Sequence, residues 1–211
     1  MSDKGKELLE GAYALSSPDD NIDYYRSFAA HYDKVFARDM GFNLPQAVAS
    51  QFSKLAKPTD RPVADLGCGT GIVATLFSKD TIVDGFDISP EMLAIAAEKR
   101  RYRNLIQIDL TAPGPDWPSD YGAVVSSGTF THGHLGPDAL ETAIGLGRAG
   151  CLFVLSINKA HYSAMGFEKR INQLAANGRI KDLTLSKVPI YLDNTHDHAA
   201  DMAMLCCFRK G

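Results

Sequence analysis

The chain has 211 residues, of which 45% are hydrophobic and 22% are charged. These proportions are ordinary for a soluble globular protein, and the length suits a single domain with a substantial core. The formal net charge of −3 excludes the basic field that a nucleic-acid backbone requires. The first residues do not resemble a secretion signal, and no apolar run approaches the length of a membrane span. We therefore expect a cytoplasmic protein, monomeric or homodimeric, that binds neither nucleic acid nor membranes.

Four cysteines, at positions 68, 151, 206 and 207, show no spacing typical of a zinc site. Cys206 and Cys207 are adjacent in a strand-like run, so their side chains should point to opposite faces. The pattern indicates reduced, buried thiols of a cytosolic protein, and we predict no metal.

Two helices are predicted before the first strand. Apolar and aromatic residues at 22, 25, 28, 29, 32, 35 and 36 form a helical stripe. The second helix should run from Pro45 to Leu55, with Asn43 as its cap and Val48, Phe52 and Leu55 facing inward. Residues 1–57 would form an N-terminal helical cap on a core of residues 58–211, the two together making one domain.

The core alternates strands with helices. Strands are predicted at 62–66, 81–87, 104–109, 121–127 and 150–157, and helices at 71–78, 90–101, 136–148 and 163–177. Ser89 and Pro90 favour a helix start, and Gly145 and Gly147 should shorten the third of these helices. Two strand-like runs, 180–191 and 202–209, follow without a helix between them. We predict a doubly wound, Rossmann-like α/β fold with seven strands, mostly parallel with an antiparallel C-terminal hairpin, and helices on both faces.

A glycine-rich turn dominates the sequence. The apolar strand in Val63-Ala-Asp-Leu-Gly-Cys-Gly-Thr-Gly71 leads into three glycines, which let a backbone approach a ligand closely. About 20 residues further on, the next apolar run ends in Asp87. A glycine turn followed by a carboxylate at this distance is how an α/β sheet holds a ribose. The pattern predicts a nucleoside-containing cofactor.

The residues around the turn select among such cofactors. The dinucleotide pattern G-x-G-x-x-G/A fits only if it starts at Gly69 and ends at Ala74, whereas the glycines cluster as G-x-G-x-G. Asp65 just ahead of them does not suit a pyrophosphate, but it can meet an amino group. S-Adenosylmethionine carries one ribose, no phosphate, and a cationic amino group and sulfonium. We therefore predict S-adenosylmethionine as the cofactor.

The segment Asp65-Leu-Gly-Cys-Gly-Thr-Gly71 resembles the first motif of class I methyltransferases. The resemblance implies that Asp87 holds the ribose hydroxyls and that Asp109 approaches the adenine amino group. It also implies that Ile88 and Met92 sandwich the adenine and that tyrosines of an N-terminal helix lie over the donor, where aromatic faces favour a cation. The predicted cofactor-binding residues are Tyr25, Tyr32, Asp65, Gly67, Cys68, Gly69, Gly71, Asp87, Ile88, Met92, Asp109, Leu110 and Ser127.

Three further segments narrow the resemblance to the methyltransferase-like proteins named after the Williams–Beuren syndrome chromosomal region. They are Tyr25-Arg-Ser-Phe-Ala-Ala-His-Tyr-Asp33, Gly128-Thr-Phe-Thr-His-Gly-His134, and Asn158-Lys-Ala-His-Tyr162 followed by Gly166-Phe-Glu168. In the broad family the loop after the fourth strand faces the methyl acceptor. We expect a small-molecule acceptor bound by Thr131, His134, His161 and Tyr162.

His132 is the candidate catalytic residue, since a neutral imidazole near pH 7 can take a proton from an attacking hydroxyl or amine. The alternative, that its ring only hydrogen-bonds the loop, carries similar weight. A metal pair of His132 and His134 would need both side chains on one face, which requires an extended loop, and no carboxylate lies beside them in the sequence. A solvated loop explains His196 and His198.

The sequence thus predicts an S-adenosylmethionine-dependent methyltransferase. Two alternatives stay open, namely an NAD-dependent oxidoreductase and a non-catalytic adenosylmethionine-binding protein on the same fold.

Overall fold

A computed structural model describes residue 11 and residues 41–111, 117–192 and 196–211. The predicted helix with Tyr25 and Tyr32, and most of the predicted N-terminal cap, lie outside the described residues. Within them, no helix is both long and apolar enough to cross a membrane.

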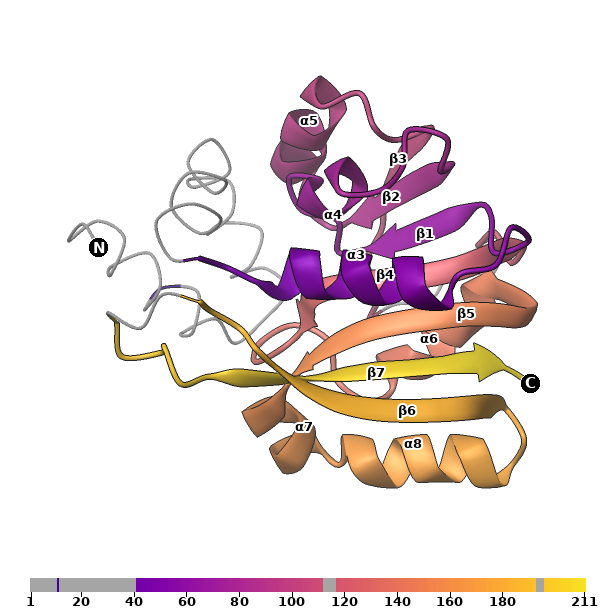
Figure 1. The fold of residues 1–211 in the computed structure, drawn as a ribbon, viewed down its shortest axis with the longest axis vertical. Helices are drawn as coiled ribbons and strands as arrows, with labels where there is room; N and C mark the ends of the chain where they lie inside the picture. The colour runs from indigo at the N-terminus through magenta and orange to yellow at the C-terminus, as the bar shows by residue number, and fades with distance from the viewer. Residues whose placement is uncertain (1–10, 12–40, 112–116, 193–195) are drawn as a thin grey trace.

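The described chain is built around one seven-stranded sheet with helices on both faces (Figure 1). The strand order is β3-β2-β1-β4-β5-β7-β6. Every neighbouring pair from β3 to β5 is parallel, whereas β7 runs antiparallel to both β5 and β6. The predicted fold class is confirmed. The strands are β1 Val63–Leu66, β2 Val83–Asp87, β3 Asn104–Gln107, β4 Tyr121–Phe130, β5 Gly147–Asn158, β6 Ile180–Pro189 and β7 Met202–Lys210.

The helices bury the two faces of this sheet in separate clusters. Residues of α3 and α4 pack on one face, and residues of α6, α7 and α8 pack on the other. Helix α5 lies against β2 and β3. The helices are α3 Leu44–Leu55, α4 Ile72–Thr75, α5 Pro90–Glu98, α6 Ala139–Leu146, α7 Lys159–Met165 and α8 Phe167–Ala176.

The predicted cysteine environment is confirmed by this packing. Cys206 and Cys207 belong to different clusters and therefore point to opposite faces of the sheet. All four cysteines are buried free thiols, and burial raises the pKa of Cys206 to about 12.

Three details of the helices differ from the prediction. The Asn43 side chain does not cap α3 but donates to the Pro189 carbonyl oxygen at 3.0 Å, because β6 ends beside it. Leu55 is 37% exposed at the end of α3 instead of facing inward. The predicted helix over 163–177 is two helices, α7 and α8, because Gly166 between them adopts φ 80° and interrupts the helical backbone.

Other local predictions are confirmed. The Ser89 hydroxyl accepts from the Met92 N–H at 3.2 Å and starts α5, with Pro90 in its first turn. Helix α6 ends at Leu146, and Gly147 already begins β5. The chain leaves β1, β2, β3 and β4 at the same sheet edge, on the left of Figure 1, and ligands of open α/β sheets bind at such an edge.

Candidate functional site

The glycine turn after β1 is packed too tightly for side chains at two of its positions. A Cβ on Gly67 would lie 2.1 Å from Thr129 Oγ1, and one on Gly71 would lie 2.8 Å from the Tyr102 ring. Both glycines have positive φ, 63° and 86°. Thr129 Oγ1 also donates to the Leu66 carbonyl oxygen at 3.1 Å, so β4 clamps the turn. Only glycine fits this geometry.

Asp87, at the end of β2, fastens the turn from the other side. Its Oδ2 accepts from the Gly69 N–H at 2.8 Å, and its Oδ1 accepts from the Ser89 N–H at 2.9 Å. Burial raises the pKa of Asp87, and the bonds from Ser89 and Gly69 partly offset that rise. Each carboxylate oxygen has two lone pairs, so both oxygens retain acceptor capacity toward a ligand.

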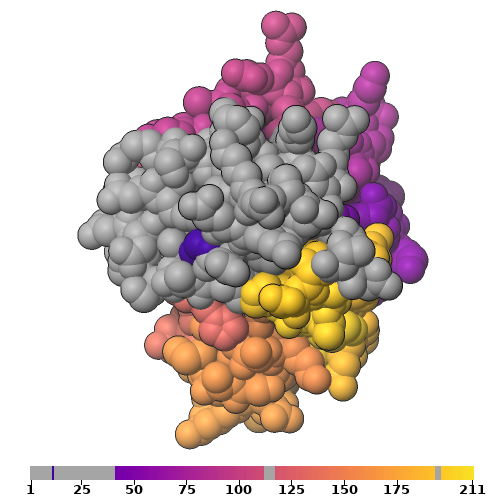
Figure 2. Space-filling model, turned by 90° about the vertical axis from the view of Figure 1, so that its left-hand side faces the viewer, coloured from indigo at the N-terminus to yellow at the C-terminus, as the bar shows by residue number. Residues whose placement is uncertain are grey.

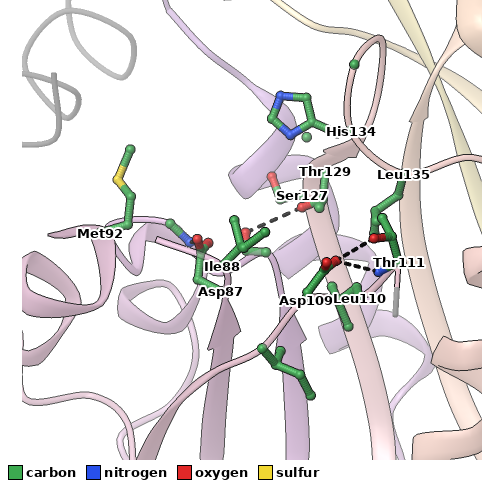
Figure 3. A pocket seen from close by; sticks show the side chains of 15 residues that line it. Asp87, Ile88, Met92, Asp109, Leu110, Thr111, Ser127, Thr129, His134 and Leu135 are labelled. Atoms are coloured by element: carbon green, nitrogen blue, oxygen red, sulfur yellow. Dashed lines mark hydrogen bonds between the residues drawn. The ribbon is translucent and has the colours of Figure 1, made fainter. Parts of the chain in front are cut away.

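A pocket opens beside this carboxylate at the ends of β1, β2, β3 and β4 (Figure 3). Asp109 is fixed within it, since its Oδ1 accepts from the Thr111 N–H at 2.8 Å and from the Thr111 hydroxyl at 2.6 Å. Eight predicted cofactor-binding residues line this donor pocket: Gly67, Gly69, Asp87, Ile88, Met92, Asp109, Leu110 and Ser127.

A smaller pocket adjoins the donor pocket on the far side of the turn. It is lined by Cys68 and Thr70 of the turn, by Phe42 and Pro45, and also by Ser127. Ser127 therefore lines both pockets, and its Oγ is buried without a hydrogen-bond partner in the structure. An unpaired buried hydroxyl at the junction is available to a polar ligand group.

Asp65 lies fully buried in β1, and its hydrogen-bond partner, Tyr102, was not predicted from the sequence. Its Oδ2 accepts from the Tyr102 hydroxyl at 2.7 Å, whereas its Oδ1 has no partner in the structure. Burial raises the pKa of Asp65 to about 7, against the lowering effect of the Tyr102 bond, and nearby Asp87 adds to the rise. Tyr102 lies between α5 and β3, and no local pattern marks it, because it meets Asp65 only through sheet pairing.

The loop from Thr131 to Leu135 carries His132 and His134 and directs them into different pockets. Gly133 has φ 72°, and the His134 N–H bonds the Thr131 carbonyl oxygen at 3.1 Å, so the loop is a turn rather than extended. His134 consequently lines the donor pocket, whereas His132 lines a different one. Burial, together with nearby His161, lowers the pKa of His134 to about 4.

His161 and Tyr162 lie beneath this loop in α7, both buried. His161 Nε2 lies 3.0 Å from the Leu135 carbonyl oxygen, and its ring centroid lies 5.2 Å from that of His132. Tyr162 stacks on Phe167 with centroids 6.0 Å apart. Burial lowers the pKa of His161. His161 thus supports the loop from the core side, Tyr162 packs on α8, and neither residue lines the pockets described above.

The pocket that His132 lines is formed by three segments far apart in sequence. Its volume is about 350 Å³, and its other lining residues come from 158–163 and 200–202. Figure 2 looks onto this side of the molecule and shows the orange α7–α8 region next to the yellow segment that leads into β7. Sequence reasoning missed two charged residues here, Lys159 and Asp201. We name this cavity the His132 pocket.

The segment before β7 differs from the predicted solvated loop. His196 is only 8% exposed, and its ring lies edge-on to Tyr191 with centroids 4.8 Å apart. His198 Nδ1 lies 3.0 Å from Asp201 Oδ2. His196 is therefore a packing residue, and His198 pairs with a carboxylate of the His132 pocket.

Comparison with known proteins gives matches to methyltransferases. Residues 63–149 match the family model described as "Methyltransferase domain". A trans-aconitate 2-methyltransferase of Mycobacterium sp. (strain KMS) is 31% identical over 99 residues, which cover 46% of this chain and 34% of the relative. The chain spans about a third of the length of the curated relatives it matches.

Two solved structures illustrate the similarity of fold. Phosphoethanolamine N-methyltransferase 2 of Haemonchus contortus, in complex with phosphomonomethylethanolamine and S-adenosylhomocysteine, gives a TM-score of 0.62 at 14% identity, covering 90% of this chain and 58% of that one. Magnesium protoporphyrin IX methyltransferase of Synechocystis PCC 6803 with bound S-adenosylmethionine gives 0.55 at 17% identity, covering 99% and 92%. At these identities the likeness shows the fold alone. Residues 63–149 thus match a methyltransferase domain, and the strand order agrees with the Rossmann-like fold of the solved methyltransferases.

Proposed function

We propose that this chain is an S-adenosylmethionine-dependent methyltransferase that acts on a small-molecule acceptor. The observation that carries the proposal is the Asp87 carboxylate, held by the Gly69 and Ser89 N–H groups at the mouth of the donor pocket. A carboxylate fixed in this way can accept from both hydroxyls of a ribose, and the glycine turn beside it lets the ligand approach the backbone.

The residues of the pocket fit the rest of the donor. Ile88 and Met92 offer apolar contacts for the adenine, and Asp109 offers an acceptor for its amino group. The methionine end would lie toward Ser127, whose buried Oγ lacks a partner. When bound, the donor supplies a methyl group on a cationic sulfur. The contribution of the chain is to align that methyl with the acceptor and to exclude water.

The acceptor would lie against the loop 131–135. We propose His132 as the general base, because its Nδ1 is buried and has no hydrogen-bond partner in the structure, so it is available to take a proton from the acceptor. His134 suits a neutral contact instead, since its lowered pKa keeps it uncharged near pH 7. Thr131 would contribute to the same surface, with His161 and Tyr162 behind it.

A small acceptor is supported by two similarities. The segments around His132 and around His161 resemble the Williams–Beuren-region methyltransferase-like proteins, and one relative over 99 residues is named for trans-aconitate. The neighbours solved with S-adenosylmethionine or S-adenosylhomocysteine support the donor.

Calorimetry on the purified chain tests the donor. We expect S-adenosylmethionine and S-adenosylhomocysteine to bind with dissociation constants in the micromolar range, about −8 kcal/mol. Asp87→Ala should weaken binding by about 2–4 kcal/mol, because charge-assisted bonds to the ribose are lost. Asp80→Ala, an exposed aspartate away from the pocket, is the matched control. Saturable NAD binding with no heat from either adenosyl ligand would replace the proposal with the dehydrogenase alternative.

A further inference from the structure

Some polar groups that line the His132 pocket have no partner among the described residues and are available to a ligand. Lys159 lies at its rim, and no ion pair or hydrogen bond joins the Lys159 ammonium to another described residue. His132 also lines it, and its Nδ1 is buried with no hydrogen-bond partner among the described residues. Asn158 spends its Oδ1 on the Ala160 and His161 N–H groups, at 2.9 and 3.2 Å, and so can offer only its amide NH₂ to a ligand.

The single carboxylate among the lining residues is already paired. Asp201 Oδ2 lies 3.0 Å from His198 Nδ1. Asp201 and Lys159 belong to two different segments of the pocket lining, 200–202 and 158–163. The ammonium of Lys159 is therefore the charge that a ligand would meet uncompensated. A ligand bearing a negative group can pair with the Lys159 ammonium and accept from the Asn158 amide, which a cation or an apolar group cannot do.

We propose that the His132 pocket binds the anionic group of the methyl acceptor, a carboxylate or phosphate, through Lys159. This inference rests on the proposed function for the identity of its ligand. The cavity of about 350 Å³ falls within the range of small-molecule sites, about 300–1,000 Å³. It shares the wall 131–135 with the donor pocket, since His134 and His132 line the two sides of Gly133. An acceptor anchored at Lys159 would lie against the loop whose other side lines the donor pocket.

Lys159 acts here as a specificity-determining residue, and His132 lies between it and the donor pocket in the shared loop. The relative named for trans-aconitate agrees with a carboxylate acceptor, but the inference rests on the unpaired ammonium of Lys159. Because Lys159 is exposed, its replacement should leave the fold intact.

The experiment measures anion binding by calorimetry at low ionic strength, with and without saturating S-adenosylhomocysteine. The probes are acetate, succinate, trans-aconitate and inorganic phosphate, each up to about 10 mM, a range that detects affinities weaker than millimolar. Lys159→Gln removes the charge and Lys159→Arg keeps it. Lys169→Gln is the control, because Lys169 is an exposed lysine of α8 outside the pocket.

We expect at least one probe to bind and Lys159→Gln to weaken it about tenfold, with Lys159→Arg within about threefold and Lys169→Gln unchanged. Preference for phosphate over the carboxylates, with the same sensitivity to Lys159, assigns the anion as a phosphate. If no probe binds while S-adenosylhomocysteine does, or if Lys159→Gln leaves binding unchanged, the anion site is refuted and the donor site stands. If S-adenosylhomocysteine fails to bind, the proposed function falls, and anion binding in its absence still decides the pocket.

Discussion

At the scale of single residues, the Asp65–Tyr102 pair places a titratable group in the middle of the sheet. Asp65 has no exposed surface, and only one of its oxygens is hydrogen-bonded, by the Tyr102 hydroxyl. Burial favours its neutral form and raises its pKa to about 7. The folded state therefore holds a proton on Asp65 that the unfolded chain has already lost near neutral pH.

This proton predicts a pH dependence of stability. A raised folded-state pKa gives stability that is fully present below the unfolded value of 3.8 and is lost as pH rises through about 7. Relative to Asp65→Asn, the wild type should lose about 2–3 kcal/mol between pH 5 and pH 8. Urea unfolding of both proteins at each pH measures the difference and cancels the contribution of the histidines. Parallel stability curves for the two proteins would contradict the buried, protonated Asp65.

The two loop histidines should differ in kinetic role. His134 is neutral above pH 4, so its titration cannot shape a pH–rate profile near neutrality. If His132 is the base, His132→Gln should lower turnover by about 10²–10⁴-fold, with donor affinity within a few-fold. His134→Gln should leave the shape of the pH–rate profile near neutrality unchanged and weaken S-adenosylhomocysteine, because His134 lines the donor pocket.

The assay is steady-state kinetics over a pH series, with an acceptor that the wild type methylates. A His132→Gln protein with unchanged turnover and unchanged KM would remove the catalytic role from His132. A raised KM with turnover intact would instead make it a positioning contact.

At the scale of elements, two glycines of the turn after β1 differ in their surroundings, and variants of each can separate fold stability from ligand binding. Gly67 faces Thr129 of β4, within the packed interior, whereas a Cβ on Gly69 would meet nothing within 4 Å. Gly69 lines the donor pocket, so under the proposed function the empty space beside it is space for the ligand. The turn is constrained by packing at Gly67, and we expect it to be constrained by binding at Gly69.

Gly67→Ala should destabilise the fold by about 2–4 kcal/mol, because it adds a clash with Thr129 to the strain of positive φ. Gly69→Ala should cost only the strain, about 1–2 kcal/mol, yet weaken S-adenosylhomocysteine at least about tenfold, since its methyl group occupies ligand space. Urea unfolding and calorimetry on both variants give the two readouts. Equal losses of stability would show that the turn relaxes around Thr129.

At the scale of the whole molecule, one buried ion pair ties the start of the sheet to its last strand. Arg209 of β7 donates to both oxygens of Asp60, at 3.0 and 2.9 Å, and the two side chains are 13% and 5% exposed. Burial alone would raise the pKa of Asp60, but the bonds from Arg209 and Lys57 hold it below its usual range. The pair closes the loop before β1 onto the C-terminal strand.

Arg209→Met should lower the free energy of unfolding by about 3 kcal/mol, because it leaves the buried Asp60 carboxylate uncompensated. Arg179→Met is the matched control, since Arg179 pairs with Glu141 at 2.9 Å but is 51% exposed, and such a pair contributes at most about 1 kcal/mol. Urea unfolding at pH 7 compares them. The Asp60 contribution is present above pH 3.8 and lost as pH falls, so the gap between Arg209→Met and wild type should narrow in acid. If both variants lose a similar free energy of unfolding, the buried Arg209–Asp60 pair stabilises the fold no more than the exposed Arg179–Glu141 pair.

Much of the fold followed from local chemistry that the sequence displays directly. Buried parallel strands are short runs rich in apolar residues, so Val63–Leu66 and Val83–Asp87 were recognisable without their neighbours, although each contains aspartate. Ser89 starts α5 through its side chain and Pro90 through its ring. Gly147, a poor helix former, follows the last residue of α6 and begins β5. The glycine turn and Asp87 lie at the predicted sheet edge for the same reason, because their spacing along the chain sets their place there; that they bind the cofactor stays a prediction.

What only the tertiary structure decided depends on contacts between distant segments. Asn43 binds the Pro189 carbonyl instead of capping α3, and Tyr102 meets Asp65 across two strands. Gly133 turns the loop so that His132 and His134 enter different pockets, and residues near 132, 159 and 201 meet only when β7 returns beside β5. Spacing along a chain fixes which face of its own element a residue occupies, whereas its partners across the fold are set by strand order and loop geometry, which no local pattern encodes.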